Sequence, residues 1–574
     1  MATEVAARSP SHPSLLTSGA APAYERHRPE ETALYTVVCE QLETFLARAR
    51  EGDRPAPRFI EQELRAYLRC GILAHGFLRL HCDACGHDRL VPFSCKRRGF
   101  CPSCGGRRMA DTAAHLVDCI LPQVPIRQWV LTLPYPLRYR CAYDAALTSE
   151  ILRAFLRALF SALRRRAKSQ WGTSRGQCGS VTFIQRFGSA LNLNLHFHIM
   201  ALDGVYACDK GNATRFLPLS PPSPDEVARV LAGAARRIAR LVASRAEGDD
   251  DALARDEPLL ATLAAASLRS RVAMGPGAGQ RWRRLGDRVE PDGEEHDPEA
   301  SLHIPQHGGM SLHAKVAVPA RDRRRLERLC RYVARPPLAH DRIEVRPDGR
   351  LALRLKTRWR DGTTHILMER HELLERLVPL IPPPRAHQVR YHDVLAPCAS
   401  ARDRVVLGPR TPLAAAEVQA PLPEKHPDPA PMRPRDPKER CDTDDNQAVR
   451  ANSNCLSGSH ARAGRRGGNP GAVNRPDLGQ GVAPDRIVPR RTPWAELLQR
   501  VFEVDALRCP NCGARMRLLA AIEDPEVARQ ILGCLGLPAR GPPLAAPPGA
   551  SVDSDHDSWD EESLWDFDQA PPGG

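Results

Sequence analysis

Three groups of residues in this sequence have the side-chain types and the spacing that metal binding or bond cleavage requires. The first is a pair of Cys-x-x-Cys motifs, Cys82/Cys85 and Cys101/Cys104, with fifteen residues between them. Two such motifs at this separation can supply four thiolates to one tetrahedral zinc ion. The spacing therefore predicts a zinc site in this block, and redox chemistry of the same thiols is the alternative.

Neighbouring residues could modify this site. Gly86 and Gly105 follow the two motifs, where a zinc knuckle needs tight backbone turns. Other side chains nearby could replace a ligand or bind a second ion, although burial without a ligand fits each of them better: Cys70, His81, His87 and Cys95. Four arginines could present cations to a DNA backbone or simply form a solvated cluster: Arg97, Arg98, Arg107 and Arg108.

A third Cys-x-x-Cys motif lies far away, at Cys509-Pro-Asn-Cys512-Gly. It has no evident second pair, and Cys534 and His556 are the only late residues that could complete it. The motif therefore predicts either a second zinc site or a turn whose cysteines bind no metal.

The second group lies in LNLNLHFHIMALDGVY, which alternates like a strand. His196 and His198 are two residues apart, so both imidazoles face one way while Phe197 faces the other. Two neutral imidazoles side by side can begin a divalent-metal site. Asn192 and Asn194 continue the same polar face.

A third ligand to this ion would come from a neighbouring segment. Gln185, in the preceding strand VTFIQRFG, is the favoured oxygen ligand, and Asp203 competes with it. Two imidazoles and one oxygen leave coordination positions open, which Mg²⁺ or Mn²⁺ needs in order to hold a phosphate.

The third group centres on Tyr332, near the end of RDRRRLERLCRYVARPP. Helical spacing puts three arginines on the same stripe as this phenol: Arg325, Arg328 and Arg335. Nearby cations favour phenolate over phenol and can hold a phosphate, and tyrosine is an accepted covalent nucleophile. A purely structural tyrosine at the edge of the core is the alternative.

The composition of the chain fits a nucleic-acid partner. It has 574 residues with a formal net charge of +14, and only seven of its 82 basic residues are lysine. Guanidinium groups pair with two phosphate oxygens at once, although a GC-rich genome gives the same bias and a membrane surface also attracts basic proteins.

The same sequence argues against secretion and membrane insertion. No apolar run approaches the roughly 20 residues that span a bilayer, and the N-terminus lacks a signal pattern. We expect a bacterial cytoplasmic protein, associated with the nucleoid when bound to DNA, whose 18 cysteines serve metal binding and not disulfides.

Hydrophobic periodicity outlines the elements that would position these residues. Residues 126–400 read as one mixed α+β domain, with strands in IRQWVLTLP, VTFIQRF and LHAKVAVP, a basic helix over 151–168, and hairpins turning at Asp348-Gly349 and Asp361-Gly362. A charged insertion runs from about 246 to 300. The remaining expected boundaries are a disordered N-terminus (1–30), a helical and zinc-binding domain (31–122), a disordered linker (401–490), a small C-terminal Cys-x-x-Cys module (492–545) and an acidic disordered tail (546–574).

These segments together resemble the HUH-type transposases of rolling-circle insertion sequences. The likeness covers residues 59–397 and returns in 492–545, and it rests on stretches such as SCKRRGFCPSCGGRRM, TFIQRFGSALNLNLHFHIMALDGVY, RYVARPPLA and LKTRWRDGTTHILM. It implies a central antiparallel sheet with flanking helices, His196 and His198 as the metal motif, and Tyr332 as the nucleophile. Some members carry two tyrosines four residues apart, whereas Arg328 stands at the earlier position here.

The resemblance implies an enzyme that nicks and rejoins single-stranded DNA of transposon ends and target through a 5′-phosphotyrosine intermediate. No GxxxxGK[ST] phosphate loop is found, which agrees with a reaction that needs no ATP. A rolling-circle replication initiator or conjugative relaxase shares this chemistry. Two functions without strand cleavage also fit the motifs: a zinc-dependent DNA-binding regulator and an RNA-binding zinc protein.

Overall fold

A computed structural model describes most of the chain. The described residues are 24–173, 175–208, 214–245, 251–285, 305–359, 361–408, 493–502 and 504–547. Several expectations therefore lie outside the described residues: disorder of 1–23, both ends of the charged insertion (246–250 and 286–300), most of the linker, His556 and nearly all of the acidic tail. The middle of that insertion, residues 251–285, is described and contains two helices and a short strand.

Helices open the described part of the chain. Helix α1 (Ala33–Glu51) begins at Thr32, whose hydroxyl accepts a hydrogen bond from the Tyr35 backbone, and α2 (Arg58–Arg69) follows. Next come the hairpin β1 (Phe77–His81) and β2 (Asp88–Pro92), then α3 (Pro102–His115), which continues as a π-helical turn, η3 (Leu116–Ile120). Helical structure thus continues to residue 120, close to the end expected for this domain at residue 122.

An antiparallel sheet forms the centre of the larger domain. Its main order is β15-β4-β5-β3-β10-β9, and β11 also pairs with β3. The strands are β3 (Ile126–Thr132), β4 (Gly179–Phe187), β5 (Leu193–Leu202), β9 (Gln306–His307), β10 (Met310–His313), β11 (Ala317–Val318) and β15 (Val389–Asp393). LHAKVAVP was predicted as one strand, but it forms β10 and β11, which both pair with β3.

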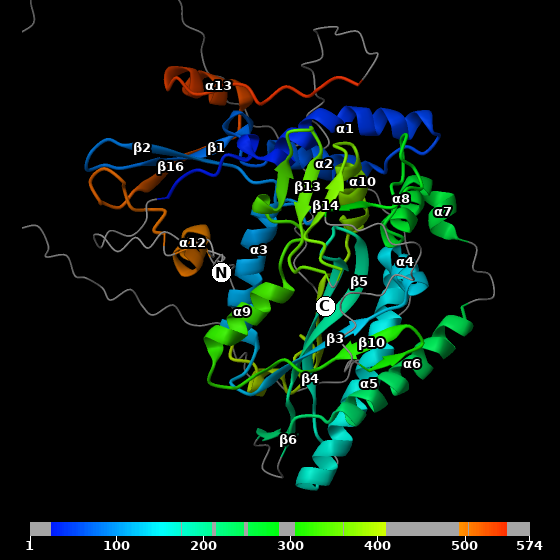
Figure 1. The fold of residues 1–574 in the computed structure, drawn as a ribbon. Helices are drawn as coiled ribbons and strands as arrows, with labels where there is room; N and C mark the ends of the chain where they lie inside the picture. Colours follow the sequence, from blue (N-terminus) through cyan, green and yellow to red (C-terminus); the bar gives the residue numbers. More distant parts are fainter. Residues whose placement is uncertain are drawn as a thin grey trace, which may run out of the picture. The chain divides into compact units, whose positions relative to one another are not determined.

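Helices cover the two faces of this sheet differently (Figure 1). One face carries Phe197 and packs against α5 (Ala145–Trp171) and α6 (Pro224–Ala243). The opposite face carries Phe183 and Met200 and packs against η3 and α9 (Arg323–Val333). Strand alternation produces this division, because neighbouring side chains point to opposite faces.

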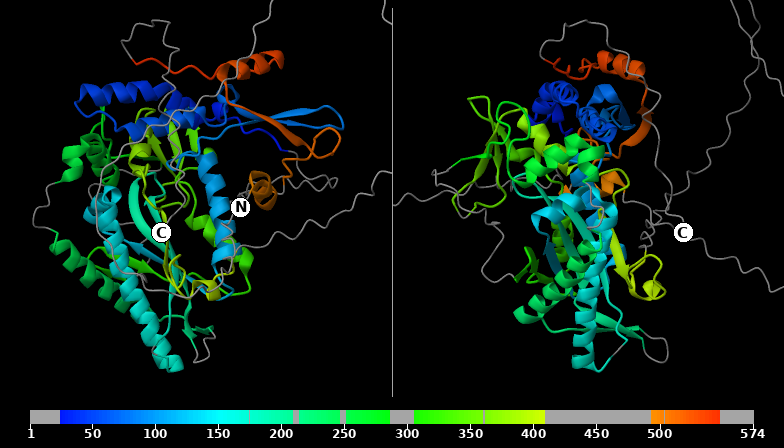
Figure 2. Two further views of the ribbon diagram at one scale, coloured as in Figure 1. Left: turned by 180° about the vertical axis from the view of Figure 1, so that it is seen from behind. Right: turned by 90° about the vertical axis from the view of Figure 1, so that its right-hand side faces the viewer.

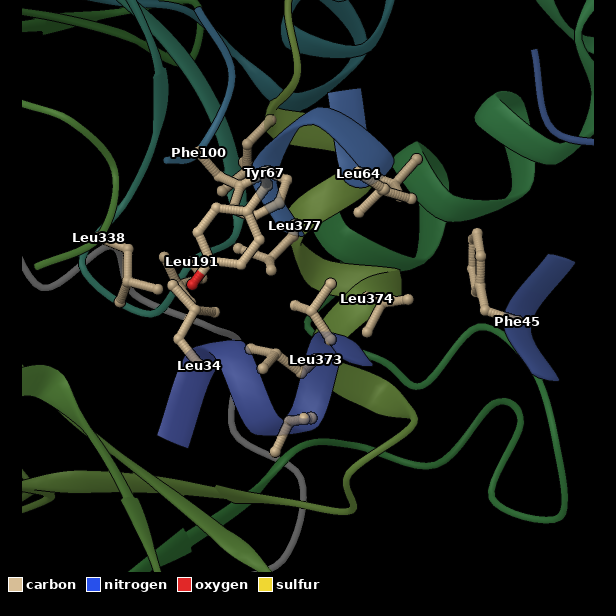
Figure 3. Packing of buried hydrophobic residues seen from close by; sticks show 14 of the residues in the cluster. Leu34, Phe45, Leu64, Tyr67, Phe100, Leu191, Leu338, Leu373, Leu374 and Leu377 are labelled. Carbon is tan, nitrogen blue, oxygen red and sulfur yellow. The ribbon is translucent and has the colours of Figure 1, made fainter. Parts of the chain in front are cut away.

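A smaller sheet, β12-β13-β14-β8, packs with the N-terminal helices. Figure 3 shows part of their shared core, in which leucines from α1, α2 and α10 (Glu372–Leu377) surround Tyr67 and Phe100. Its strands are β8 (Arg283–Leu285), β12 (Ile343–Val345), β13 (Leu351–Arg354) and β14 (His365–Met368). The two predicted hairpins share β13, which pairs with both β12 and β14.

The remaining elements are short or peripheral. They are α4 (Tyr135–Tyr143), α7 (Ala252–Asp256), α8 (Pro258–Leu268), α11 (Arg402–Val405), the hairpin β6 (Gly204–Cys208) and β7 (Thr214–Pro218), and the 3-10 turns η1 (Pro29–Glu31), η2 (Leu73–His75), η4 (His340–Arg342) and η5 (Val378–Leu380). Among the helices described, none is long and apolar enough to cross a membrane.

The C-terminal segment does not form a separate module. It contains α12 (Trp494–Phe502), β16 (Arg517–Ile522) and α13 (Pro525–Cys534). Strand β16 pairs antiparallel with β1, from Phe77↔Ile522 to His81↔Arg517, and completes the sheet β16-β1-β2. Two views show this late segment lying beside the early hairpin (Figures 1 and 2).

Candidate active site and metal centres

The two histidines lie where strand alternation predicts, on the α9 side of the central sheet. His196 and His198 are 8% and 4% exposed, and their Nε2 atoms are 3.0 Å apart. In β5, His196 stands opposite Thr132 of β3 and Gln185 of β4. Both rings therefore enter a narrow space between the sheet and α9.

Hydrogen bonds orient both imidazoles. His196 Nδ1 lies 2.8 Å from the Asn194 carbonyl, which can only accept, so Nδ1 carries the proton and Nε2 offers its lone pair. His198 Nδ1 lies 2.7 Å from the Gln128 amide nitrogen. A half turn of this amide would present its oxygen, place the proton on Nδ1 and free the second Nε2 as a ligand.

Burial keeps the second imidazole neutral. The pKa of His198 lies well below its ordinary value because burial penalises the charged form, and the charges of His196, Arg335 and Lys356 add to the effect. The neutral ring is the form that binds metal. His198 is therefore held in the protonation state that a metal ligand requires.

Gln185 fits the predicted role of third ligand. Its amide nitrogen donates to the Val333 carbonyl at 2.7 Å, whereas its Oε1 is buried with no hydrogen-bond partner among the described residues. A buried oxygen without a partner is costly unless a ligand uses it. Asn194 Oδ1, two residues before His196, is a second buried oxygen in the same condition.

Asp203, the competing candidate for third ligand, is paired with Arg127 instead. Its carboxylate receives two hydrogen bonds from Arg127, at 3.0 and 2.7 Å, and Arg127 also donates to the Ala314 carbonyl. This buried bidentate pair joins strand ends. Within the described residues, no third His, Cys, Asp or Glu joins the two histidines in a ligand group.

Tyr332 lies beside the histidines, on the last turn of α9. Asp322 caps the helix by accepting from the Arg325 backbone, and Leu326, Cys330 and Val333 form its buried face. The phenol ring is 40% exposed, and its centroid lies 6.1 Å from that of His198 with the planes at 87°. The helix thus presents the ring to both the histidines and solvent.

Hydrogen bonds at both ends fix the position of this helix. Leu121 and Pro122 directly follow η3. At the start of α9, Arg323 donates to their carbonyls, at 2.9 and 3.1 Å respectively. At its end, Val333 accepts from Gln185. These bonds hold the helix at both ends, so the position of Tyr332 relative to β5 is set by hydrogen bonds as well as by packing.

Cations surround the tyrosine, but not quite those predicted. Arg335 Cζ lies 4.3 Å from the ring centroid. Arg325 and Arg328 are exposed on the earlier turns of α9. Lys356, which sequence reasoning missed, places its Nζ 3.9 Å from the same centroid. Lys356 comes from the loop between β13 and β14, and only the LKTRWRD stretch of the family resemblance could have pointed to it.

The cysteines do not group as predicted. Cys101 and Cys104 gather with Cys70 and Cys95, whereas Cys82 and Cys85 gather with Cys509 and Cys512. The reason is the hairpin: Cys70 and Cys95 flank its base, and Cys82 and Cys85 form its tip. Strands of five residues separate base from tip by about 16 Å. One ion cannot bridge that distance.

The base cluster fits zinc. The Cys70–Cys104, Cys95–Cys104 and Cys70–Cys101 sulfur distances are 3.7, 3.3 and 3.6 Å. Zn–S bonds of about 2.3 Å in a tetrahedron put sulfurs about 3.8 Å apart. Cys70 and Cys95, expected to be unliganded, thus complete this group of four thiols.

Other expectations about the cysteine block also need correction. Gly105 makes no knuckle turn but lies in α3, where an added Cβ would stand 2.5 Å from Pro336 Cβ. Cys534 is exposed on α13 and belongs to neither cluster. Arg108 donates to the Lys96 carbonyl, Arg97 is half-buried, and Arg98 and Arg107 are exposed and remain candidates for DNA contact.

Comparison with known families agrees with this arrangement. Residues 39–133 match the family model described as a transposase zinc-binding domain, and residues 179–403 match the model described as a putative transposase. The chain therefore has the domains of a transposase. Together the matches support its assignment to the IS91-type rolling-circle transposases.

The two matched regions contain most of the candidate site residues. The first holds the base cluster with Cys82 and Cys85, and the second holds Gln185, the two histidines, Tyr332 and Lys356. Cys509 and Cys512 lie outside both. No curated protein and no solved structure matches the chain.

Proposed function

We propose that this transposase cuts and rejoins single-stranded DNA with Tyr332 as the nucleophile. The observation that carries the proposal is the packing of α9 on the sheet face that bears His196 and His198, which brings the phenol ring within 6.1 Å of an imidazole ring. A helix on the opposite face would have separated nucleophile and histidines by the thickness of the sheet.

In the proposed reaction the Tyr332 oxygen attacks the scissile phosphorus. The new O–P bond forms as the bond from phosphorus to the 3′ oxygen breaks, the phenol proton leaves to solvent, and the departing oxygen takes up a proton. The products are a 5′-phosphotyrosine and a free 3′-hydroxyl. The phosphodiester energy stays in the covalent link, so rejoining by a 3′-hydroxyl needs no nucleotide cofactor.

The surrounding residues have distinct roles in this proposal. His196, His198 and Gln185 would hold Mg²⁺ or Mn²⁺, which polarises the scissile phosphate and stabilises its developing charge. Lys356 and Arg335 stabilise negative charge on the phenol oxygen and on the phosphate. The exposed side of Tyr332 is where a single strand can approach.

The zinc-binding region and the exposed arginines would dock the DNA. Zinc at the base cluster fixes the start of α3, and α3 packs along α9. Exposed guanidinium groups near this helix pair, Arg98, Arg107, Arg325 and Arg328, can contact phosphates without reading sequence. Single-stranded DNA of transposon ends and target is the proposed partner.

A covalent-adduct assay tests the proposal. Full-length protein, Mg²⁺ and a labelled single strand carrying the DNA that flanks the gene should give an adduct that survives denaturation. Tyr332→Phe should form none, whereas Tyr135→Phe, a change at a similarly exposed tyrosine (43%), should behave as wild type. Equal adduct from Tyr332→Phe would refute the assignment, and DNA binding without any adduct would favour a non-catalytic regulator.

A further inference from the structure

We propose that Cys82, Cys85, Cys509 and Cys512 form a second zinc site, shared between the tip of the β1–β2 hairpin and the C-terminal segment. We call it the tip cluster. This inference does not depend on the chemistry proposed for Tyr332, because it concerns different residues and a different metal.

The sulfur positions fit one tetrahedral ion. The Cys82 and Cys512 sulfurs are 3.4 Å apart, those of Cys85 and Cys509 are 3.5 Å apart, and all four lie within 4.8 Å of one another. These separations are near the roughly 3.8 Å expected around zinc and far beyond the roughly 2.05 Å of a disulfide. Four thiolates and no oxygen ligand select zinc over magnesium or calcium.

The two halves of the tip cluster have the same backbone conformation. In each motif the residue after the second cysteine is a glycine with positive φ, +73° at Gly86 and +76° at Gly513. In each, this glycine donates to the carbonyl of the first cysteine, at 2.8 and 3.0 Å. The turn directs the peptide N–H groups inward, where they stabilise thiolates.

A second hydrogen bond in each motif completes the repeated pattern. Cys82 N donates to the His87 carbonyl at 2.9 Å, and Cys509 N donates to the Ala514 carbonyl at 2.8 Å. Cys101-x-x-Cys104 shares only the glycine bond, from Gly105 N to the Cys101 carbonyl at 2.9 Å, because it opens helix α3. The structure thus contains two equivalent knuckles that face each other, a relation that their sequence separation of more than 420 residues conceals.

The contacts around the tip cluster align the two knuckles but bury few apolar side chains. Arg517 of β16 pairs with Asp83 between the first two cysteines, at 2.7 Å, and Arg89 donates to the Ala506 carbonyl at 2.7 Å. The apolar side chains buried with Cys82 and Cys509 are few: Leu80, Val91 and Met516. Units with so small a core usually need a metal or a disulfide.

The proposed zinc would therefore fasten the C-terminal segment to the zinc-binding domain. That attachment has a consequence near the candidate active site. Arg500 of α12 pairs with Glu327 of α9 at 2.8 Å and with Asp118 of η3. The C-terminal segment, which would supply two of the four metal ligands, thus also contacts the helix that carries Tyr332.

Metal counting on the full-length protein tests the proposal. Wild type purified with zinc should hold two zinc ions per chain, and the double variant Cys509→Ser/Cys512→Ser should hold one. Cys82→Ser should also lose one ion, whereas the exposed Cys534→Ser should keep two. Wild type with a single ion, or a double variant that still holds two, would overturn the proposal.

Thiol labelling of the unmodified protein gives a second measurement that does not depend on a variant folding. Cys85 and Cys512 are exposed side chains, yet N-ethylmaleimide should label them slowly while zinc is bound. Adding a chelator should raise the labelling of all four tip-cluster cysteines together by more than tenfold, with Cys398, another exposed cysteine, unchanged. Rapid labelling of Cys85 and Cys512 before chelation would contradict a bound metal.

Discussion

Gln185 connects the two halves of the candidate active site to each other. Its amide nitrogen donates to the Val333 carbonyl, one residue after Tyr332, while its Oε1 is buried without a partner among the described residues and its strand position is opposite His196. One side chain thus fixes the end of the helix that carries Tyr332 and offers an oxygen on the strand position opposite His196.

The two functions of Gln185 can be separated by substitution. Gln185→Glu keeps an oxygen ligand but loses the donor to Val333, whereas Gln185→Ala loses both. We expect Mn²⁺ binding, followed by electron paramagnetic resonance, to weaken at least 10- to 100-fold in Gln185→Ala, since loss even of outer-shell partners of metal ligands costs about that much. Gln185→Glu should bind Mn²⁺ at least as tightly as wild type yet form less adduct.

Asn194→Ala is the matched control, because Asn194 Oδ1 is the other buried oxygen without a partner near His196. If Asn194→Ala weakens Mn²⁺ binding and Gln185→Ala does not, the third ligand is Asn194 and the assignment of Gln185 is wrong.

Lys356 should act on the chemical step. Its ammonium lies 3.9 Å from the Tyr332 ring centroid, where it would stabilise negative charge that develops in the proposed reaction. We expect Lys356→Ala to slow adduct formation at saturating DNA by about 10- to 100-fold, less than the 10²–10³-fold typical of a buried donor, because the ring is partly exposed. Lys356→Arg should recover part of the rate.

Lys315→Ala controls for the loss of one positive charge, because Lys315 is exposed and has no contact with Tyr332 among those described. It should weaken DNA binding slightly and leave the saturated rate unchanged. A Lys356→Ala defect that disappears at high DNA concentration would assign this lysine to DNA binding alone.

The sequence predicted the local geometry of the site better than its long-range assembly. Alternation in β5 correctly placed His196 and His198 on one face, because a strand has a fixed period of two. Helical spacing around Tyr332 likewise predicted α9. Which face of the sheet would receive α9 depended on tertiary packing, and only the family resemblance pointed to it.

The cysteines show where sequence spacing misleads. Proximity along the chain paired Cys82/Cys85 with Cys101/Cys104, but the rigid length of the hairpin separates these motifs. The true partner of the first motif is Cys509/Cys512, which the β1–β16 pairing brings to it. No local pattern encodes a pairing across that distance, because all three motifs share the sequence Cys-x-x-Cys-Gly and it does not single out a pair.

The stability of the protein should depend on the ionisation of Glu375. Burial raises the pKa of this carboxyl to about 7, against the lowering effect of hydrogen bonds from the Ala273 and Met274 backbones. The folded state thus holds the proton more tightly than the unfolded state does. Stability is therefore full below about pH 4.5 and falls as pH rises to about 7, by at most ~3 kcal/mol.

Glu375→Gln should remove this dependence, because the amide oxygen can accept both backbone bonds without charge. Its unfolding free energy relative to wild type should rise by ~2–3 kcal/mol between pH 5 and pH 8 in urea titrations. Fluorescence of Trp282, which stacks on the neighbouring Arg376, reports on this region. Glu344→Gln, a change at an exposed carboxyl on β12, should follow wild type. Parallel pH curves for wild type and Glu375→Gln would disprove the raised pKa.

Removing zinc should release the C-terminal segment. A specific protease site inserted between residues 411 and 489, followed by cleavage, leaves that segment attached only through non-covalent contacts and the tip cluster. Structural zinc at four thiolates contributes about 10–16 kcal/mol of apparent binding free energy at neutral pH, more than the small apolar clusters there can supply. The cut halves should therefore co-elute in size-exclusion chromatography with zinc present and separate after EDTA.

The same cleavage in Cys509→Ser/Cys512→Ser should separate the halves without EDTA, and in Cys534→Ser it should not. Separation should also free Arg500 from Glu327 and so loosen the amide-exchange protection of α9, the helix that carries Tyr332. Halves that stay together in EDTA would mean that strand pairing between β1 and β16 is sufficient and that the metal is not what holds the ends of this chain together.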